Sequence, residues 1–288
     1  MQVPADGKIE KEENLEQISI ADACLNILFG KHFADKVCLY RNVIWDQKIC
    51  TLDLSNIVPG RPPSLQFATA RVKFPKDAEF SHSLKRAQAL HFFANHELLA
   101  VEIMCLMILK LKWDTPELEH VKRTIWTTLQ DEQRHLHMYQ RRLVELGFTF
   151  GDFPVNDFFW RSFLKVEKLE DYMSLMSLTF ETANLDFAAF YSSLFEKNGD
   201  FASAQLMQKI YLDELHHVGV GIKYFETTYP TQSLWESYKK YLPYPITPAR
   251  SKGIHYQRHH RSLAGFSTQF IEQLEDFTDN FRITDRKR

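Results

Sequence analysis

Apolar side chains recur at the spacing of an amphipathic helix through the middle of the chain. Between residues 81 and 229 they fall at positions i, i+3, i+4 and i+7, which places them on one face of an α-helix. The first such stretch is the most apolar, but Glu102 and Lys110 interrupt it, so we interpret it as a buried helix rather than a membrane span. The pattern predicts four long helices, over about residues 83–112, 115–147, 169–197 and 200–229.

Turn residues between these helices predict two helical hairpins. Thr115 followed by Pro116 is a strong helix start, because proline lacks only an N–H group that has no partner in the first turn. Asn198-Gly199 favours a helix end, since both residues tolerate the left-handed conformation found there. Both loops are short, which makes the connected helices antiparallel neighbours, and the longer segment 148–160 joins the hairpins. The sequence therefore predicts an all-α fold with a four-helix bundle over residues 81–229.

The two ends of the chain are predicted to extend this bundle. Residues 1–80 contain one expected helix at about 19–29 and the proline-rich stretch VPGRPPS. Residues 230–288 contain PYPITPAR, a basic loop and a last helix expected over about Leu263–Asp279. We expect both extensions to pack on the bundle.

Composition supports a helical, cytoplasmic protein. Only 10 Gly and 11 Pro are present, fewer than an all-β or doubly wound chain needs for its turns. The net charge of -2 favours neither nucleic acid nor an anionic membrane, and the N-terminus lacks the basic and apolar segments of a secretory signal. The cysteines show no zinc-type spacing, as expected of reduced thiols; they are Cys24, Cys38, Cys50 and Cys105.

Two Glu-x-x-His motifs lie in the middle of predicted helices. Glu132 and His135 belong to an otherwise largely apolar face of the second helix, and Glu214 and His217 to such a face of the fourth. A buried carboxylate or imidazole must be hydrogen-bonded or bind a cation, because an uncompensated buried charge costs several kcal/mol. One Glu-x-x-His pair is equally well explained by a hydrogen bond in the core and by metal binding. Two such pairs at matching positions of two helices favour metal binding. Two further matches are expected to face solvent, Glu79/His82 and Glu117/His120.

An internal repeat adds one acid from each remaining helix. NHELLAVE aligns with TFETANLD and DEQRH with DELHH, which pairs Glu97 with Glu181 at an offset of 84 residues and the two motifs at 82. Glu97 and Glu132 are equally far from their hairpin loop, as are Glu181 and Glu214, so each pair is expected to lie side by side. Glu102 and Asp186 also align, but Glu102 points about 140° away from Glu97. Both are second choices, better suited to hydrogen bonds between helices.

This set is the ligand set of ferritin-like di-iron and di-manganese carboxylate proteins. Four carboxylates neutralise two divalent cations, and two imidazoles suit Fe or Mn, so we expect two Fe ions or an Mn/Fe pair. The first functional hypothesis is an O₂-activating oxidoreductase that acts on an unknown small organic molecule, with Tyr139 as a candidate catalytic residue or simply a core tyrosine. The alternatives are ferritin-type iron oxidation or metal handling without an organic substrate, and a structural metal clip in an interaction protein. The predicted ligands are Glu97, Glu132, His135, Glu181, Glu214 and His217.

A few features of the sequence do not belong to this candidate metal site. The basic cluster at 250–261 suits phosphate or RNA, but a solvated loop is the favoured interpretation, so we expect no nucleic-acid partner. Gly219 and Gly221 lie inside the fourth predicted helix, where they indicate a close helix approach or a kink. A homodimer is left open. The cluster consists of Arg250, Lys252, His255, Tyr256, Arg258, His259, His260 and Arg261.

The chain resembles the bacterial ferritin-like family known as domain of unknown function 455. The resemblance rests on LHFFANHELLAVE, DEQRHLHMYQRRLVELGFTFGDFPVNDFFW, FETANLDFAAFY, GDFASAQLMQKIYLDELHHVGVGIKYF and PARSKGIHYQRHHRSLAGF, and it spans about residues 20–275. It implies a ferritin-like bundle with a dinuclear metal site and no established substrate. Members of the family tend to carry a histidine two residues before the first-helix glutamate, where this chain has Asn95.

Overall fold

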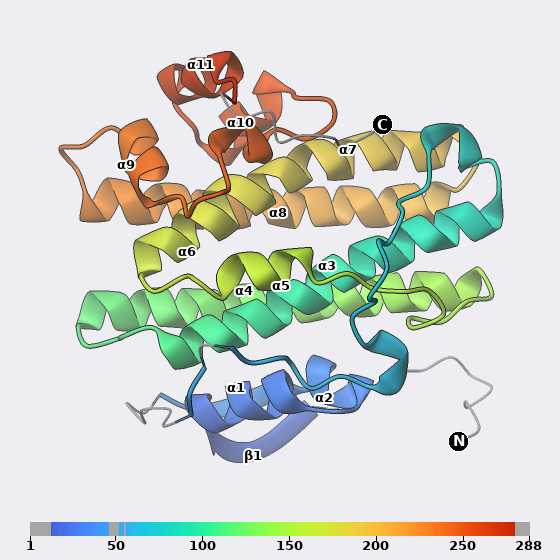
Figure 1. Ribbon diagram of the computed structural model, residues 1–288, viewed down its shortest axis with the longest axis horizontal. Coiled ribbons are helices and arrows are strands. Elements are labelled where there is room, and N and C mark those ends of the chain that lie inside the picture. Colours follow the sequence, from blue (N-terminus) through green and yellow to red (C-terminus); the bar gives the residue numbers. More distant parts are fainter. Residues whose placement is uncertain (1–12, 46–51, 55, 280–288) are drawn as a thin grey trace. The chain divides into compact units, whose positions relative to one another are not determined.

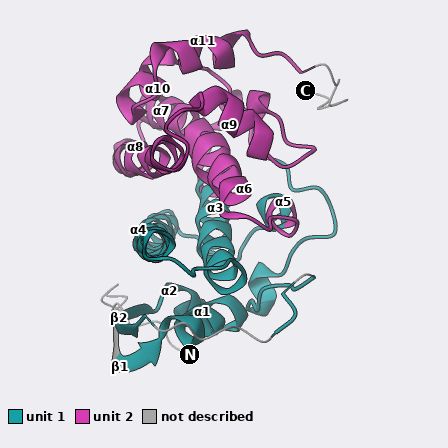
Figure 2. Cartoon of the chain, turned by 90° about the vertical axis from the view of Figure 1, so that its left-hand side faces the viewer, with its two compact units in different colours: residues 1–73, 90–160 teal, residues 74–89, 161–288 magenta. Residues whose placement is uncertain are grey.

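The computed structural model describes residues 13–45, 52–54 and 56–279. This part of the chain is mainly helical, with one two-stranded sheet (Figure 1), which agrees with the all-α class in outline. It divides into two compact units, one from residues 1–73 and 90–160 and the other from residues 74–89 and 161–288 (Figure 2). Each unit contains one predicted hairpin, and the association of the hairpins into a bundle stays a prediction. Cys50 lies outside the described residues, and the other three cysteines are free thiols.

The first unit is built on the hairpin of α3 and α4. α4 begins where its cap predicts, since Thr115 Oγ1 accepts a hydrogen bond from Leu118 N at 3.3 Å. Two short strands pair in parallel and flank α1 and α2 in the chain; the sequence pattern did not predict them, because neither strand alternates apolar and polar residues. The described elements are β1 (Glu13–Ser19), α1 (Ile20–Phe29), α2 (Phe33–Val37), β2 (Leu39–Ile44), η1 (Pro63–Leu65), most of α3 (Ser83–Lys110), α4 (Pro116–Glu145) and the start of α5 (Phe158–Phe163).

A buried lysine fixes the N-terminal segment within this unit. Lys36 Nζ donates to Ile27 O at 2.8 Å and to Leu28 O at 2.9 Å, which satisfies carbonyls at the C-terminal end of α1. Gln133 of α4 donates to Lys36 O at 2.9 Å. Burial lowers the pKa of Lys36, and the neighbouring Glu102 opposes this shift. Within the first unit, Lys36 therefore joins the segment of α1 and α2 to α4.

The second unit contains the other hairpin and the C-terminal extension. Asp200 caps α8, because its Oδ1 accepts a hydrogen bond from Ser203 N at 3.1 Å. Arg86 Nε lies 3.0 Å from Oδ2 of the same carboxylate. The described elements are η2 (Asp77–Glu79), the first turns of α3, the end of α5, α6 (Leu169–Leu175), η3 (Met176–Glu181), α7 (Thr182–Lys197), α8 (Phe201–Thr228), α9 (Leu234–Tyr241), η4 (Pro248–Ser251), α10 (Arg258–Ala264) and α11 (Thr268–Asp276).

The third predicted helix is interrupted by a π-helical segment, η3. Thr179 Oγ1 donates to Ser174 O at 2.8 Å, and Thr182 Oγ1 donates to Ser177 O at 3.0 Å. Both bonds reach back five residues instead of the three or four usual for threonine in an α-helix. These hydroxyl groups thus bond one carbonyl at the end of α6 and one inside η3, an arrangement that periodicity alone did not reveal. π-Helical segments are rare and often lie at functional sites.

The C-terminal extension ends in two short helices instead of the single helix expected over Leu263–Asp279. Gly265 adopts φ +101°, a left-handed conformation that ends α10. Ser267 Oγ then accepts from Phe270 N at 3.2 Å and caps α11. The prediction was wrong because it placed Gly265 inside one long helix, whereas this glycine ends α10.

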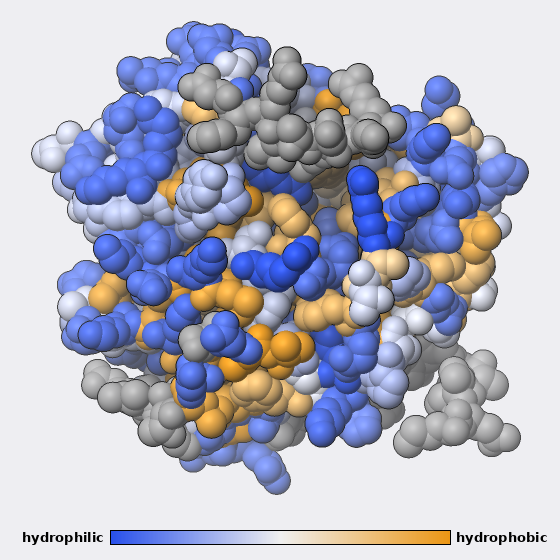
Figure 3. Space-filling view, in the orientation of Figure 1, coloured by the Kyte–Doolittle hydropathy of each residue, from blue (hydrophilic) through white to orange (hydrophobic). Residues whose placement is uncertain are grey.

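The apolar helix α3 is a core helix. It is the one described helix long and apolar enough to cross a membrane, and 83% of its most apolar window is buried inside the protein. Hydrophilic side chains predominate on the face drawn in Figure 3, and the hydrophobic ones gather in smaller groups between them.

Gly221 permits a close approach between α8 and η3, as its position in the sequence indicated. A Cβ atom at Gly221 would lie 2.5 Å from Ser177 Cβ, a distance that requires the backbone to move. At Gly219 the same atom would meet only Ala264 O at 3.8 Å, which is ordinary contact. The expected close approach is therefore confirmed for Gly221, whereas Gly219 has no such close contact.

Gly221→Ala should destabilise the protein, whereas Gly219→Ala should not. Overpacking typically costs about 1–3 kcal/mol, while alanine in an open helical position gains about 0.5–1 kcal/mol over glycine. Urea unfolding of the two variants and the parent chain measures both effects. Equal stability of the two variants would contradict the close packing of η3 on α8.

Candidate metal centre

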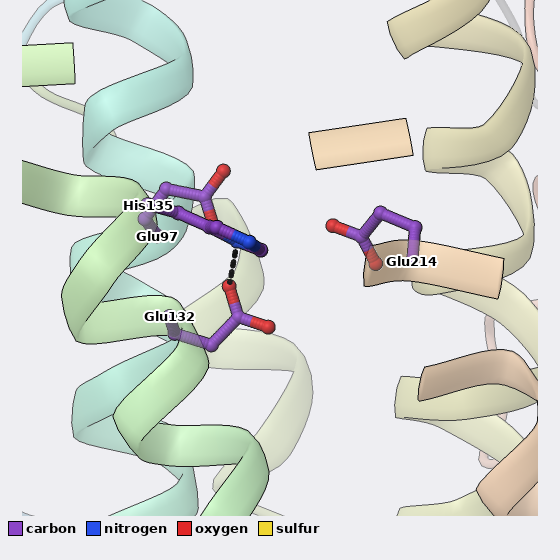
Figure 4. Close-up of side chains that lie close together, drawn as sticks. All are labelled: Glu97, Glu132, His135 and Glu214. Atoms are coloured by element: carbon purple, nitrogen blue, oxygen red, sulfur yellow. Dashed lines mark hydrogen bonds and ion pairs between the residues drawn. The ribbon is translucent and has the colours of Figure 1, made fainter. Parts of the chain in front are cut away.

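Three predicted ligands come together in the first unit. Glu97 on α3 and Glu132 and His135 on α4 each offer a ligand atom, and these atoms lie within 4.8 Å of one another. Figure 4 shows the three side chains turned toward one another; it also draws Glu214 of α8. All three side chains are buried. This is unusual, because glutamate is mostly exposed in proteins and histidine is usually only partly buried. Glu97 and Glu132 thus lie close together, as their equal distance from the hairpin loop predicts.

The electrostatics of this group favour a cation. His135 Nδ1 lies 3.2 Å from Glu132 Oε2 and 3.8 Å from Glu97 Oε2. Burial and the neighbouring Glu132 carboxylate raise the pKa of Glu97 well above its ordinary value. A metal ion that binds here would have to displace a proton from Glu97, so its affinity should fall as the pH falls.

The equivalent group in the second unit has the same composition. Glu181 ends η3, and Glu214 and His217 lie on α8; their ligand atoms also fall within 4.8 Å of one another. Glu214 Oε2 lies 3.5 Å from His217 Nδ1, and Glu214 Oε1 accepts from Asn184 Nδ2 at 3.3 Å. Among the described residues, buried Glu214 Oε2 accepts no hydrogen bond. A buried acceptor of this kind suits a metal ion.

The two other Glu-x-x-His matches differ from these groups in burial. Glu117, His120 and His82 are exposed and Glu79 is half-buried. Glu79 instead forms an ion pair with Lys85 at 3.5 Å. The expectation that these motifs face solvent is confirmed for all but the half-buried Glu79.

Glu102 has a different role from Glu97, within the same helix. Arg61 Nη2 and Lys36 Nζ lie 2.5 Å and 3.1 Å from its two carboxylate oxygens, and all three side chains are buried. Arg61 also donates to Asn95 Oδ1 at 3.3 Å. Glu102 thus anchors the N-terminal extension on α3, and Asn95 contributes to that anchor.

Asp186 has the corresponding role in the second unit. Its carboxylate pairs with buried Arg261 and accepts from Gly253 N at 2.9 Å and Gln257 N at 3.1 Å. The two second-choice acids therefore each hold a terminal extension to a hairpin. Their alignment in the repeat was the signal for this shared role, but the partner cations could not be identified from the sequence.

The basic cluster is largely engaged inside the second unit. Arg261 is buried on Asp186, Arg258 pairs with Glu275, and Lys252 donates to backbone carbonyls at Glu275 and Phe277. The interpretation as a solvated loop is wrong for Arg261, because the extension folds back onto α7.

Tyr139 lies one turn beyond His135 on α4. It is buried, and its ring packs against that of Phe93 on α3 with centroids 6.1 Å apart. This places it beside the helix that carries Glu97. Its catalytic role stays a prediction.

The sequence comparison assigns the chain to a family. Residues 30–272 match the family described as "Protein of unknown function (DUF455)". The chain belongs to this family. The match includes both ligand groups and both acids that anchor the extensions in this DUF455 protein. No curated protein and no solved structure matches the chain.

Glu102→Gln should destabilise this DUF455 protein strongly. The change leaves the buried charges of Lys36 and Arg61 without their carboxylate, and removing one partner of a buried ion pair costs about 3–5 kcal/mol. Glu79→Gln is the matched control, because its ion pair with Lys85 is partly exposed and should contribute less than about 1 kcal/mol. Chemical denaturation measures both; equal effects of the two substitutions would contradict the anchoring role of Glu102.

Proposed function

We propose that the two ligand groups together hold two metal ions, as the dinuclear centre of a ferritin-like four-helix bundle. The observation that carries this proposal is that each hairpin buries two carboxylates and one imidazole within ligand distance of one another. The 84- and 82-residue offsets of the repeat support a symmetric arrangement of the two groups. We extend the proposal to a bundle over residues 81–229 that both terminal segments cover.

The donor set fits two divalent ions of the Fe or Mn type. Four carboxylates would neutralise the charge of two such ions, and one imidazole for each ion adds a nitrogen ligand that suits these metals. Zinc more often takes four ligands with fewer carboxylates. Burial, and secondarily the Glu132 carboxylate, raises the pKa of Glu97, and this supports the assignment because a bound cation would stabilise the ionised carboxylate.

The activity that we favour is oxidation of a small organic molecule with O₂, inside the cytoplasm. Two reduced metal ions would supply electrons to O₂. The chain would contribute the carboxylates and imidazoles that hold the ions, and a buried site that excludes bulk water. Tyr139 is our candidate for a hydroxyl that exchanges a proton or an electron near this site. The same ligands also serve iron oxidation or metal handling, and measurements of O₂ uptake and mineral formation distinguish these activities.

Purified protein reconstituted with Fe(II) should contain about two metal ions per chain. Glu181→Ala and His217→Ala should each lose metal, since each removes a ligand from the second group. The matched controls are Glu117→Ala and His120→Ala, which alter the same sequence motif at an exposed position. Elemental analysis after removal of free metal measures the content of each variant. Retention of both ions by Glu181→Ala or His217→Ala would contradict the ligand assignment.

The reduced, iron-loaded protein should consume O₂ rapidly without forming an iron mineral. Tyr139→Phe should slow this reaction and leave the metal content unchanged, because the phenyl ring keeps the packing against Phe93. An oxygen electrode follows the reaction, and light scattering detects mineral. Growth of a mineral with added Fe(II) would favour iron storage, and no O₂ uptake by a loaded protein would favour a structural metal clip.

A further inference from the structure

We propose that the C-terminal extension positions the metal ligand Glu181, through Tyr238 and two threonine hydroxyls that fix the π-helical register of η3. This inference rests on the proposed metal site. It concerns how the second ligand group is held, and all of its residues belong to the second unit.

The π-helical segment determines which way Glu181 faces. A π turn spans one residue more than an α turn, so the residues at its end and beyond it are rotated by about 100° relative to a continuous α-helix. Glu181 is the last residue of η3, and its ligand atom lies within 4.8 Å of those of Glu214 and His217. Conversion of η3 to an α-helix would therefore turn Glu181 away from Glu214 and His217.

Two threonine hydroxyls hold this register. Thr179 and Thr182 bond the carbonyls of Ser174 and Ser177, five residues back in each case. In an α-helix the nearer carbonyls three or four residues back would be their acceptors. Both threonine side chains are fully buried, so these hydroxyls do not exchange their partners for water.

Tyr238 extends this network into the C-terminal extension. Its hydroxyl lies 2.8 Å from Thr179 Oγ1, and its side chain on α9 is fully buried. Because the single hydroxyl proton of Thr179 is given to Ser174 O, Tyr238 is the donor in this contact. The extension thus fixes the hydroxyl that bonds Ser174 O, at the end of α6 just before η3.

The extension also fixes the helix on the other side of Glu181. Asp186, five residues later, binds Arg261 and the backbone of residues 253 and 257. Gly221 allows η3 to lie against α8 one turn beyond His217, which leaves little room for a different register. Glu181 is therefore held between two attachments of the same extension.

The test compares variants that lose only a hydroxyl group. Thr182→Val and Tyr238→Phe remove the hydroxyl and keep the shape of the side chain. Thr182→Ser retains the hydroxyl and serves as the conservative control. Ser193→Ala is the second control, because it removes an ordinary hydrogen bond to Ala189 O on the exposed part of α7. Anaerobic titration with Fe(II) measures binding, and hydrogen exchange measures protection of the amides in residues 176–182. Thermal unfolding reports any general loss of stability.

Thr182→Val and Tyr238→Phe should weaken binding of one of the two Fe(II) ions by about 10–100-fold, as is usual when support for a ligand is lost. Their η3 amides should exchange faster, while Thr182→Ser and Ser193→Ala should resemble the parent chain. Wild-type affinity and wild-type exchange in both Thr182→Val and Tyr238→Phe would overturn the inference. A parent chain that binds no Fe(II) would instead contradict the proposed function, and the exchange rates would still test the role of the hydroxyls in holding η3.

Discussion

The cost of burying carboxylates is the constraint on which this structure depends. Acidic side chains are almost never fully buried unless a partner compensates them, because the protein interior solvates charge poorly. Six acids inside the described helices of the two hairpins are buried, and they fall into two kinds. Glu102 and Asp186 have arginine or lysine partners, whereas Glu97 lies beside another carboxylate and an imidazole. The first kind stabilises the fold directly, and the second kind is suited to a cation supplied from outside the chain.

This distinction explains the arrangement of the terminal segments. Each extension brings basic side chains to the buried acid that aligns in the repeat: Lys36 and Arg61 to Glu102, and Arg261 to Asp186. Each thereby satisfies a charge that would otherwise destabilise a hairpin. In the second unit the same extension reaches η3 through Tyr238. Stability and the geometry of the ligand group thus depend on the same contacts.

The sequence predicted the long helices, and which buried side chains of each hairpin lie close together, for a physical reason. Helix periodicity, Thr115-Pro116 and Asn198-Gly199 are local signals, and the position of Glu97 relative to Glu132 follows from equal distance to a loop. The π-helical segment η3 depends on contacts with Gly221 and Tyr238, which come from distant parts of the chain. Periodicity therefore predicted a uniform helix there. The partners of Glu102 were unpredictable for the same reason, because Lys36 and Arg61 approach it only after the chain folds.

We propose that the two ligand groups hold a pair of metal ions, and anomalous X-ray diffraction from crystals of the iron-loaded protein tests this proposal most directly. We predict two anomalous peaks per chain, separated by about 3.5–4 Å as in other two-metal sites. One peak should lie at Glu97, Glu132 and His135, and the other at Glu181, Glu214 and His217. A single peak, or peaks away from these side chains, would contradict the account.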